Sequence, residues 1–225
     1  MFHHLILVDE INRATPKTQA ALLEVMQEHA VTAGGERFEM PQPFSVLATQ
    51  NPLDMEGTYP LPEAQLDRFF FKLRVPFPKA AELVEISRRT TKFGESGLNT
   101  IITGEQFIAC QELLTHIPVA DPLLEYAAAL ILATHPETKS HEKVARFVSY
   151  GASPRGMQAL IRGARVHCAL SGRTAVSVDD IRRVALPALR HRLILNFEGE
   201  AGQISSDQLI DDILQKTPTP AREAA

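Results

Sequence analysis

Two adjacent carboxylates, Asp9 and Glu10, directly follow an apolar run at residues 5–8. An uninterrupted apolar run is typical of a strand buried on both faces of a parallel sheet, and ligands bind beyond the carboxyl ends of such strands. Because adjacent residues on an extended chain point to opposite sides, we expect one acid to orient a Mg²⁺ shell and the other to polarise a water. A pair of solvated acids at a strand end is the competing interpretation.

An amide residue, Asn51, closes a second mostly apolar run at residues 44–49. If the two runs form neighbouring parallel strands, its side chain lies beside Asp9, where it can hold an attacking water or a terminal phosphate oxygen. Asn-Pro pairs also initiate turns, so Asn51 followed by Pro52 has a purely structural interpretation as well.

Two arginines have the chemistry to reach a phosphate. Arg155 follows Ser153-Pro154 and falls in the first turn of a predicted helix, where the helix dipole disfavours a cation; an anion in front of the helix would offset this cost. Arg68 lies between a short polar helix and an aromatic segment, a place from which it can serve a neighbouring subunit. The competing interpretations are a tolerated surface arginine for Arg155 and an exposed, weakly paired arginine for Arg68.

The first hundred residues alternate strand and helix signals, which is the pattern that must position these groups. Thr15 followed by Pro16 predicts the start of a helix that continues to about residue 29. Gly34-Gly35 predicts a hairpin turn, and alternating apolar residues over 69–75 predict a further strand. The fold class of this part is α/β.

From about residue 100 the signals become helical. Thr103 with Gln106 forms a capping box, Asp121-Pro122 starts a second helix, and Ser153-Pro154 starts a third that Gly172 closes. Ser177 caps a fourth helix, and residues 217–225 are expected to be a disordered tail. The chain is therefore predicted to be α/β followed by all-α, divided within residues 94–102.

Composition narrows the function classes. The chain has 225 residues, 44% of them hydrophobic and 22% charged, with a net charge of −4, so no overall field favours nucleic acid. Residues 162–192 carry seven arginines, but these fall at scattered helix phases without aromatic residues, which favours a solvated helix surface or a subunit interface over nucleic-acid binding. Two cysteines make no disulfide framework, and no apolar run reaches the roughly 20 residues that span a bilayer. We expect a cytoplasmic protein with no stable membrane insertion.

Three blocks of sequence, in order, resemble the MoxR-type family of AAA+ ATPases. Residues 5–14 (LILVDEINRA) are similar to its Walker B strand and following helix, and residues 48–69 to its sensor-1 and arginine-finger region. The start of the third predicted helix, Ser153-Pro154-Arg155, resembles its sensor-2 helix. The resemblance covers essentially residues 3–200.

The resemblance implies a partial AAA+ parallel-sheet core over residues 1–98 and a helical lid domain over residues 99–216. By this resemblance Asp9 helps to bind Mg²⁺, Glu10 activates the water that attacks ATP, and Asn51 senses the γ-phosphate or aligns the water. Arg155 reaches the γ-phosphate from the lid, and Arg68 acts in trans on the next subunit of a ring, expected to be a hexamer. The implied activity is chaperone-like remodelling of partner protein complexes, some with von Willebrand factor A domains, by MgATP hydrolysis.

The chain departs from the family pattern in one respect. It contains no G-x-x-x-x-G-K-[ST] segment, the loop whose backbone amides and lysine hold the phosphates, and only eight residues precede Asp9. We therefore expect a truncated ATPase whose own binding of ATP and Mg²⁺ is in question. The alternative is a non-catalytic interaction module that docks on intact AAA+ subunits through Arg68.

Overall fold

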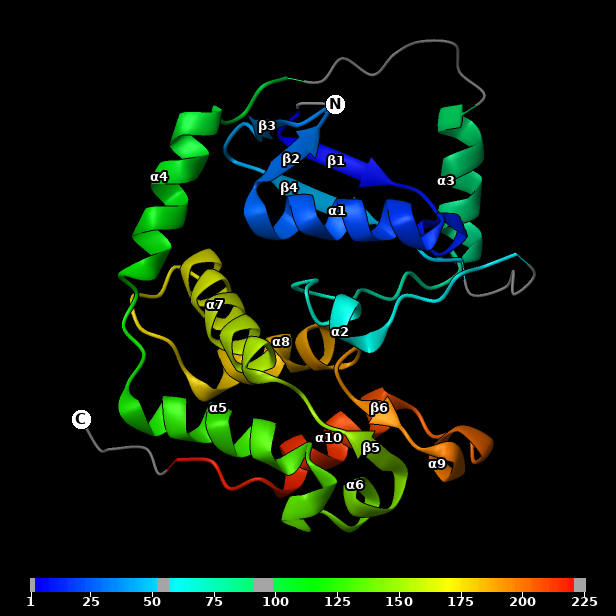
Figure 1. The fold of residues 1–225 in the computed structure, drawn as a ribbon. Helices are drawn as coiled ribbons and strands as arrows, with labels where there is room; N and C mark the ends of the chain where they lie inside the picture. Colours follow the sequence, from blue (N-terminus) through cyan, green and yellow to red (C-terminus); the bar gives the residue numbers. More distant parts are fainter. Residues whose placement is uncertain (1–2, 52–56, 91–98, 221–225) are drawn as a thin grey trace.

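The computed structural model describes residues 3–51, 57–90 and 99–220. Figure 1 shows an α/β part, which includes the N-terminus, and a separate group of helices that follows it in sequence. Each part has a hydrophobic cluster of its own, so the division into α/β followed by helices is confirmed. The predicted boundary at residues 94–102 lies mostly outside the described residues.

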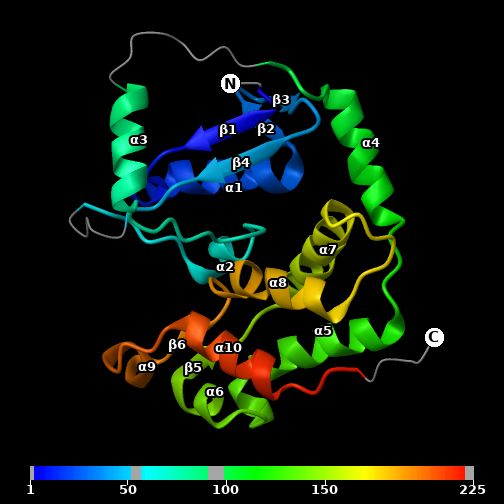
Figure 2. The ribbon, with the colours of Figure 1, turned by 180° about the vertical axis from the view of Figure 1, so that it is seen from behind.

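The α/β part is organised around two parallel strands. Strand β1 (Leu5–Val8) pairs with β4 (Ser45–Ala48), with Val8 opposite Ala48, and Figure 2 shows the two strands side by side with α1 (Pro16–Glu28) along one face. A 3-10 helix (Ile11–Arg13) joins β1 to α1. Ile11, Leu23 and Leu61 form the small core beneath the strands.

Strand β1 is buried on one face only in the described part of the chain. Ile6 and Val8 are half-buried, whereas Leu5 and Leu7 are 58% and 60% exposed. The expectation of a strand buried on both faces is therefore wrong for these residues. The physical reason is that α1 covers one face, while alternate side chains of a strand point to the other.

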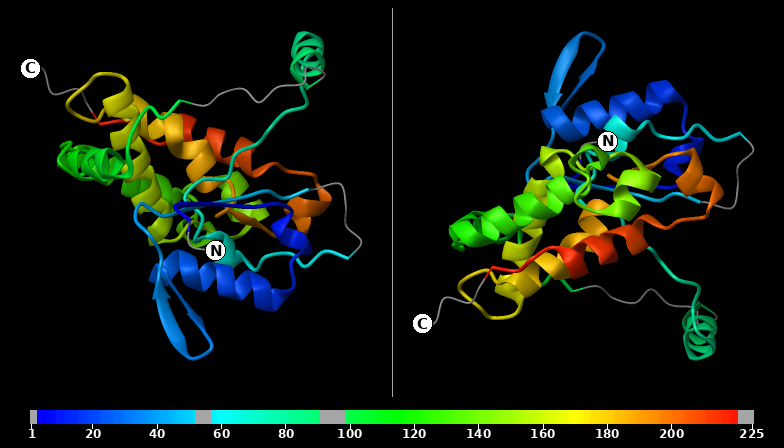
Figure 3. Two further views of the ribbon diagram at one scale, coloured as in Figure 1. Left: turned by 90° about the horizontal axis from the view of Figure 1, so that it is seen from above. Right: turned by 90° about the horizontal axis from the view of Figure 1, so that it is seen from below.

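The predicted hairpin is confirmed as β2 (Ala30–Ala33) paired antiparallel with β3 (Glu36–Glu39). The two turn residues, Gly34 and Gly35, have φ values of +62° and +85°, which glycine adopts without steric cost. Figure 3 shows the hairpin projecting away from the rest of the molecule beyond the end of α1.

The strand predicted over residues 69–75 does not form. This segment follows α2 (Glu63–Leu66), precedes α3 (Ala80–Thr90) and pairs with no strand among the described residues. Its backbone bonds to the helical part instead: the amide of Lys72 donates to the carbonyl of Pro187 at 2.9 Å, and the carbonyl of Phe70 accepts from Arg192 at 3.2 Å. An alternating pattern is compatible with any extended segment that packs on one side. It therefore did not distinguish a β-strand from an extended segment that bonds to the helical part.

The helical part contains the predicted helices and several more. Its elements are α4 (Gly104–Thr115), α5 (Asp121–Ala133), a 3-10 turn (Pro136–Thr138), α6 (Glu142–Phe147), β5 (Val148–Tyr150), α7 (Pro154–Leu170), α8 (Val178–Leu189), β6 (Ile194–Leu195), α9 (Phe197–Ala201) and α10 (Ser206–Lys216).

The start and stop signals read from the sequence of this part are confirmed. Thr103 and Gln106 form the predicted capping box at α4, and the amide of Ser177 donates to the Asp180 carboxylate at 2.8 Å at the start of α8. Gly172, just past α7, has φ +69°. Thr217 lies in the expected tail yet is buried, and residues 221–225 lie outside the described residues. Among the residues that the structure describes, no helix has the length and apolar character needed to cross a bilayer.

Candidate functional site

The parallel pairing of β1 with β4 brings the predicted acidic and amide residues to one edge of the sheet. Thr49 lies between the two acids: its hydroxyl accepts from the Glu10 amide at 2.9 Å and donates to Asp9 Oδ1 at 3.3 Å. Asn51 Nδ2 donates to Glu10 Oε1 at 3.4 Å. The neighbouring-strand condition on which the Asn51 prediction depended is met.

The backbone turns sharply at Glu10. This residue has φ 50° and ψ 53°, a left-handed conformation that non-glycine residues adopt at some cost, and Arg13 forms an ion pair with its Oε2 at 2.9 Å. The premise of an extended chain through both acids is therefore wrong at Glu10, whose backbone is left-handed. Thr49 contacts the carboxylate of Asp9 but only the backbone amide of Glu10.

The edge of the sheet thus presents one exposed carboxylate and one carboxylate held in place by neighbours. Asp9 is exposed, whereas Glu10 is half-buried between an amide and a guanidinium. An exposed carboxylate at a strand end can ligate a hard cation such as Mg²⁺ together with water and phosphate oxygens. A carboxylate beside an amide can accept a proton from a water that the amide orients.

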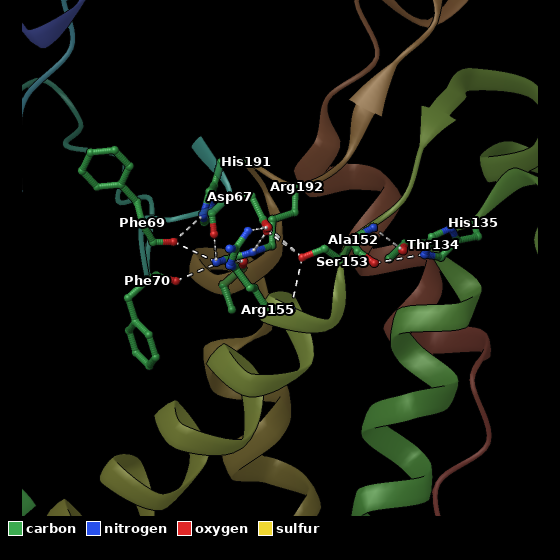
Figure 4. A network of polar contacts seen from close by, with 11 residues as sticks. Asp67, Phe69, Phe70, Thr134, His135, Ala152, Ser153, Arg155, His191 and Arg192 are labelled. Carbon is green, nitrogen blue, oxygen red and sulfur yellow. Dashed lines mark hydrogen bonds and ion pairs between the residues drawn. The ribbon is translucent and has the colours of Figure 1, made fainter. Parts of the chain in front are cut away.

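Arg155 belongs to a second polar group, drawn in Figure 4, in which it meets Asp67. Its guanidinium lies 3.3 Å from Asp67 Oδ2, and the hydroxyl of Ser153 is 2.9 Å and 2.8 Å from the two carboxylate oxygens. Ser153 also caps α7 by accepting from the Arg155 amide at 3.1 Å. The carboxylate in front of this helix supplies the negative charge that the first-turn arginine predicted.

Arg192 is the buried member of this group. Its side chain is 3% exposed, and Nε donates to Asp67 Oδ1 at 2.8 Å. The remaining guanidinium protons bond to the carbonyls of Asp67, Phe69, Phe70 and Ala188. Burial raises the pKa of Asp67, but hydrogen bonds from Ser153, Arg192 and Arg155 outweigh this effect. The pKa of Asp67 is therefore held below its usual value. Asp67 is therefore a stable anion at neutral pH.

Arg192 and its neighbour complete the end of α8. The last four carbonyls of a helix lack intrahelical partners, and the carbonyls of Pro187 and Ala188 accept here from the Lys72 amide and the Arg192 side chain. His191 Nε2 lies 3.0 Å from the Phe69 carbonyl. Burial, with Arg192 nearby, lowers the pKa of His191 to about 4, so the ring is neutral at pH 7 and donates to that carbonyl.

The interpretation of residues 162–192 as a solvated, arginine-rich surface is wrong for Arg192. That side chain is buried because a carboxylate and four backbone carbonyls, most of them on residues 67–70, meet its donors. A neighbouring arginine, Arg190, is also largely covered and pairs with Asp207 at 3.1 Å. Charged residues become buried when their donors are satisfied, and local spacing carries no signal of those distant partners.

Arg68, the predicted arginine finger, is exposed on the surface, next in the chain to Asp67. In the described part of the chain its guanidinium donates to the Leu23 carbonyl at 3.3 Å and contacts neither Asp9 nor Glu10. A pocket of about 190 Å³ beside it is lined by four arginines, Arg68, Arg155, Arg162 and Arg192, with Asp67 as the one acid among the lining residues.

Sequence reasoning missed Thr49, Asp67 and Arg192. Thr49 could have been predicted from the strand register. Val8 pairs with Ala48, so the residues that follow them, Asp9 and Thr49, lie next to each other. Asp67 carried only its adjacency to Arg68 as a signal, and Arg192 carried none that local spacing could reveal. Among the described residues, no three histidine, cysteine or acidic side chains gather as a ready-made metal site.

Comparison with known proteins identifies the class to which this arrangement belongs. Residues 1–71 match the ATPase family associated with various cellular activities (AAA), and residues 141–213 match the AAA lid domain. The parallel pair with its acidic edge thus lies within the AAA match, and Arg155 and Arg192 lie within the lid match.

The relatives place the chain within that class. It is 41% identical to the chaperone MoxR1 of Mycobacterium tuberculosis over 96% of its length and 38% identical to YeaC of Bacillus subtilis over 99%. A putative ATPase from Cytophaga hutchinsonii of known structure, 38% identical, superposes on 98% of the chain with a TM-score of 0.93. The chain belongs to the MoxR family of AAA+ ATPases. It spans 58% of MoxR1, 67% of YeaC and 67% of the Cytophaga protein.

Proposed function

We propose that the protein is a MoxR-type AAA+ subunit that hydrolyses MgATP in a ring and uses the energy to remodel partner protein complexes. The observation that carries this proposal is the sheet edge at which the Thr49 hydroxyl contacts Asp9 and the Glu10 backbone, while Asn51 contacts the Glu10 carboxylate. Phosphoryl transfer requires mainly positioning and charge neutralisation from a protein, and these side chains are suited to both.

The donor set at this edge fits a magnesium ion that also binds a nucleotide. Mg²⁺ is usually held by one or two carboxylates together with phosphates and waters rather than by an all-protein cage, and Asp9 offers one exposed carboxylate beside the Thr49 hydroxyl. Asp9 would hold the ion, directly or through a water. When bound, the ion neutralises charge on the phosphate oxygens.

Glu10 is the proposed general base of the reaction. Its Oε1 already accepts from Asn51 and its Oε2 pairs with Arg13, so both oxygens are oriented before a substrate arrives. Glu10 would accept a proton from the attacking water, while the Asn51 amide orients that water or a γ-phosphate oxygen. A general base in position typically contributes about 10²–10⁴ in rate.

The two arginines supply positive charge from different subunits in this proposal. Arg155, 53% exposed at the start of α7, would reach the γ-phosphate of its own subunit from the lid. Arg68, exposed on the surface, would reach the nucleotide of the next subunit. We propose a core at residues 1–98, a lid at 99–216 and a hexameric ring in the cytoplasm; clients with von Willebrand factor A domains are carried over from the family resemblance.

A second candidate function is a docking module without catalysis. The observation that favours it is the absence of a G-x-x-x-x-G-K-[ST] segment in these 225 residues. Such a module would bind to rings of an intact relative through the surface around Arg68 and change their ATPase rate without binding MgATP itself.

One experiment separates the two functions. The codons upstream of Met1 are sequenced, the complete gene product is purified, and its ATP binding and hydrolysis are measured for the wild type, for Glu10→Gln and for Glu36→Gln, an exposed hairpin acid, as the matched control. The first function predicts that Glu10→Gln loses turnover by about 10²-fold or more while binding ATP normally, and that Glu36→Gln matches the wild type. Retained turnover in Glu10→Gln would remove Glu10 from the mechanism, and a product that neither binds nor hydrolyses ATP would favour the second function.

A further inference from the structure

Asp67 immediately precedes Arg68 in the chain, and its carboxylate is bound by two lid arginines. We propose that Asp67 is a positioning residue that ties Arg68 to the lid, so that the state of one subunit's lid sets the position of the arginine it offers to the next subunit. This inference rests on the proposed function.

The first contact between Asp67 and the lid, through Arg192, is buried. Arg192 is 3% exposed, and three of its backbone acceptors, the carbonyls of Asp67, Phe69 and Phe70, lie on the strap at residues 67–72. Phe71 of the same strap packs against α7 so closely that a Cβ at Gly163 would lie 2.8 Å from its ring. The residues on both sides of Arg68 are therefore bound to the lid through Arg192.

The second contact between Asp67 and the lid, through Arg155, is exposed and can be exchanged for another anion. Arg155 is 53% exposed and makes a single 3.3 Å contact with Asp67, a geometry typical of a weak ion pair. A phosphate that draws Arg155 away would remove one of the two cations from Asp67 while Arg192 stays in place. A ligand shifts a conformation only through contacts that differ between its states, and the exchange of Arg155 between Asp67 and phosphate is such a difference.

Charge around Asp67 supports the exchange. The pocket beside it is lined by Arg68, Arg155, Arg162 and Arg192 with this one acid, so the carboxylate is the anion that already occupies a strongly positive site. A phosphate oxygen and Asp67 would compete for the same guanidinium. Release of Asp67 from Arg155 leaves this carboxylate bound to Arg192 and Ser153, and we expect Arg68, the next residue, to shift with it.

The test uses mixed rings of the complete gene product. Asp67→Asn subunits keep their own Asp9, Glu10 and Asn51 but offer a misplaced Arg68, whereas Glu10→Gln subunits are inactive but offer a correctly placed one. Each pure sample is expected to be slow, since a misplacement of about 1 Å costs on the order of a hundredfold in rate. In an equal mixture, half of the subunits are Asp67→Asn subunits with a competent active site. Random assembly places a Glu10→Gln neighbour with a correct Arg68 beside half of these, so activity should rise to about a quarter of the wild-type rate.

The controls define the outcomes. Arg68→Ala mixed with Glu10→Gln should show the same restoration, and Glu63→Gln, an exposed acid one turn earlier on α2, should match the wild type without mixing. Restoration with Asp67→Asn supports the inference. If Arg68→Ala is restored but Asp67→Asn is not, Asp67 acts only within its own subunit and the inference is overturned while the proposed function stands. A wild-type product without ATPase activity overturns both.

A second variant and a second readout cover the case in which Asp67→Asn fails to assemble. Ser153→Ala removes the hydroxyl that contacts both Asp67 oxygens without changing a charge, and Ser153→Thr, which keeps a hydroxyl, should restore most of the lost activity. Hydrogen exchange over residues 67–72 is measured with and without a non-hydrolysable MgATP analogue. We expect faster exchange of the strap when the analogue binds; unchanged exchange would contradict the exchangeable tie, whatever the turnover.

Discussion

Replacing Arg192 with methionine tests whether the lid holds the strap at residues 67–72. The apolar side chain has a similar length and introduces no new charge, but it removes the Arg192 hydrogen bonds to the Asp67 carboxylate and to the carbonyls of Asp67, Phe69 and Phe70. The Lys72 amide, which donates to the Pro187 carbonyl at 2.9 Å, then reports how often the strap separates from the end of α8.

The expected magnitude follows from the burial of the pair. Removing one partner of a buried ion pair costs about 3–5 kcal/mol. Asp67 is 14% exposed and keeps its contacts with Ser153 and Arg155, so we take the lower end, about 3 kcal/mol. Because 1.36 kcal/mol corresponds to a factor of ten, the strap should open roughly a hundredfold more often.

Hydrogen exchange followed by mass spectrometry or NMR on the 225-residue chain measures this opening. The matched control is Arg182→Met, an arginine on α8 whose donors reach Tyr126 and Leu214 within the lid. It should leave exchange of the strap unchanged relative to the rest of the lid. If Arg192→Met and Arg182→Met accelerate Lys72 exchange equally, aromatic packing holds the strap and the role assigned to Arg192 is wrong.

Three further predictions concern stability. Burial raises the pKa of Asp180, but hydrogen bonds from Arg173, His167 and Ser177 outweigh it and hold this pKa well below its usual value. The stabilisation by Asp180 is therefore present above about pH 4 and is lost as the pH falls. Asp180→Asn should lower the free energy of unfolding in urea by about 2 kcal/mol at pH 7 and reduce the loss between about pH 5 and pH 2, whereas its exposed neighbour Asp179→Asn should do neither. Gly151→Ala places a Cβ 2.7 Å from the Thr134 carbonyl and should lower the melting temperature, at a cost of about 1–3 kcal/mol; an unchanged melting temperature would mean that the backbone shifts freely there. Gln19→Leu leaves two backbone carbonyls near the candidate site without their buried donor and should destabilise the α/β part by about 1–3 kcal/mol, measured by calorimetry, whereas no change would show that water replaces the amide.

Local sequence signals determined the elements whose partners lie a few residues away. The helix start at Thr103, the cap at Ser177 and the turn at Gly34-Gly35 depend on contacts within about four residues, and all three are as predicted. The acidic pair after β1 was found in the same way, because an apolar run ending in carboxylates marks the edge of a sheet wherever the strand is placed.

Tertiary structure decided the features whose partners are distant in sequence. The alternation over residues 69–75 predicted a strand, but its backbone bonds to α8 and to Arg192 instead of to a neighbouring strand. Arg192 was interpreted as a surface cation, and its carboxylate partner, Asp67, lies 125 residues away. Whether a charged side chain is solvated or buried depends on which acceptors the fold brings to it, and no spacing near Arg192 encodes that contact. The sequence alone therefore predicted that Asp9, Glu10 and Asn51 come together at one edge of the sheet, and only packing between the two parts decided that Asp67, the residue before Arg68, binds two lid arginines.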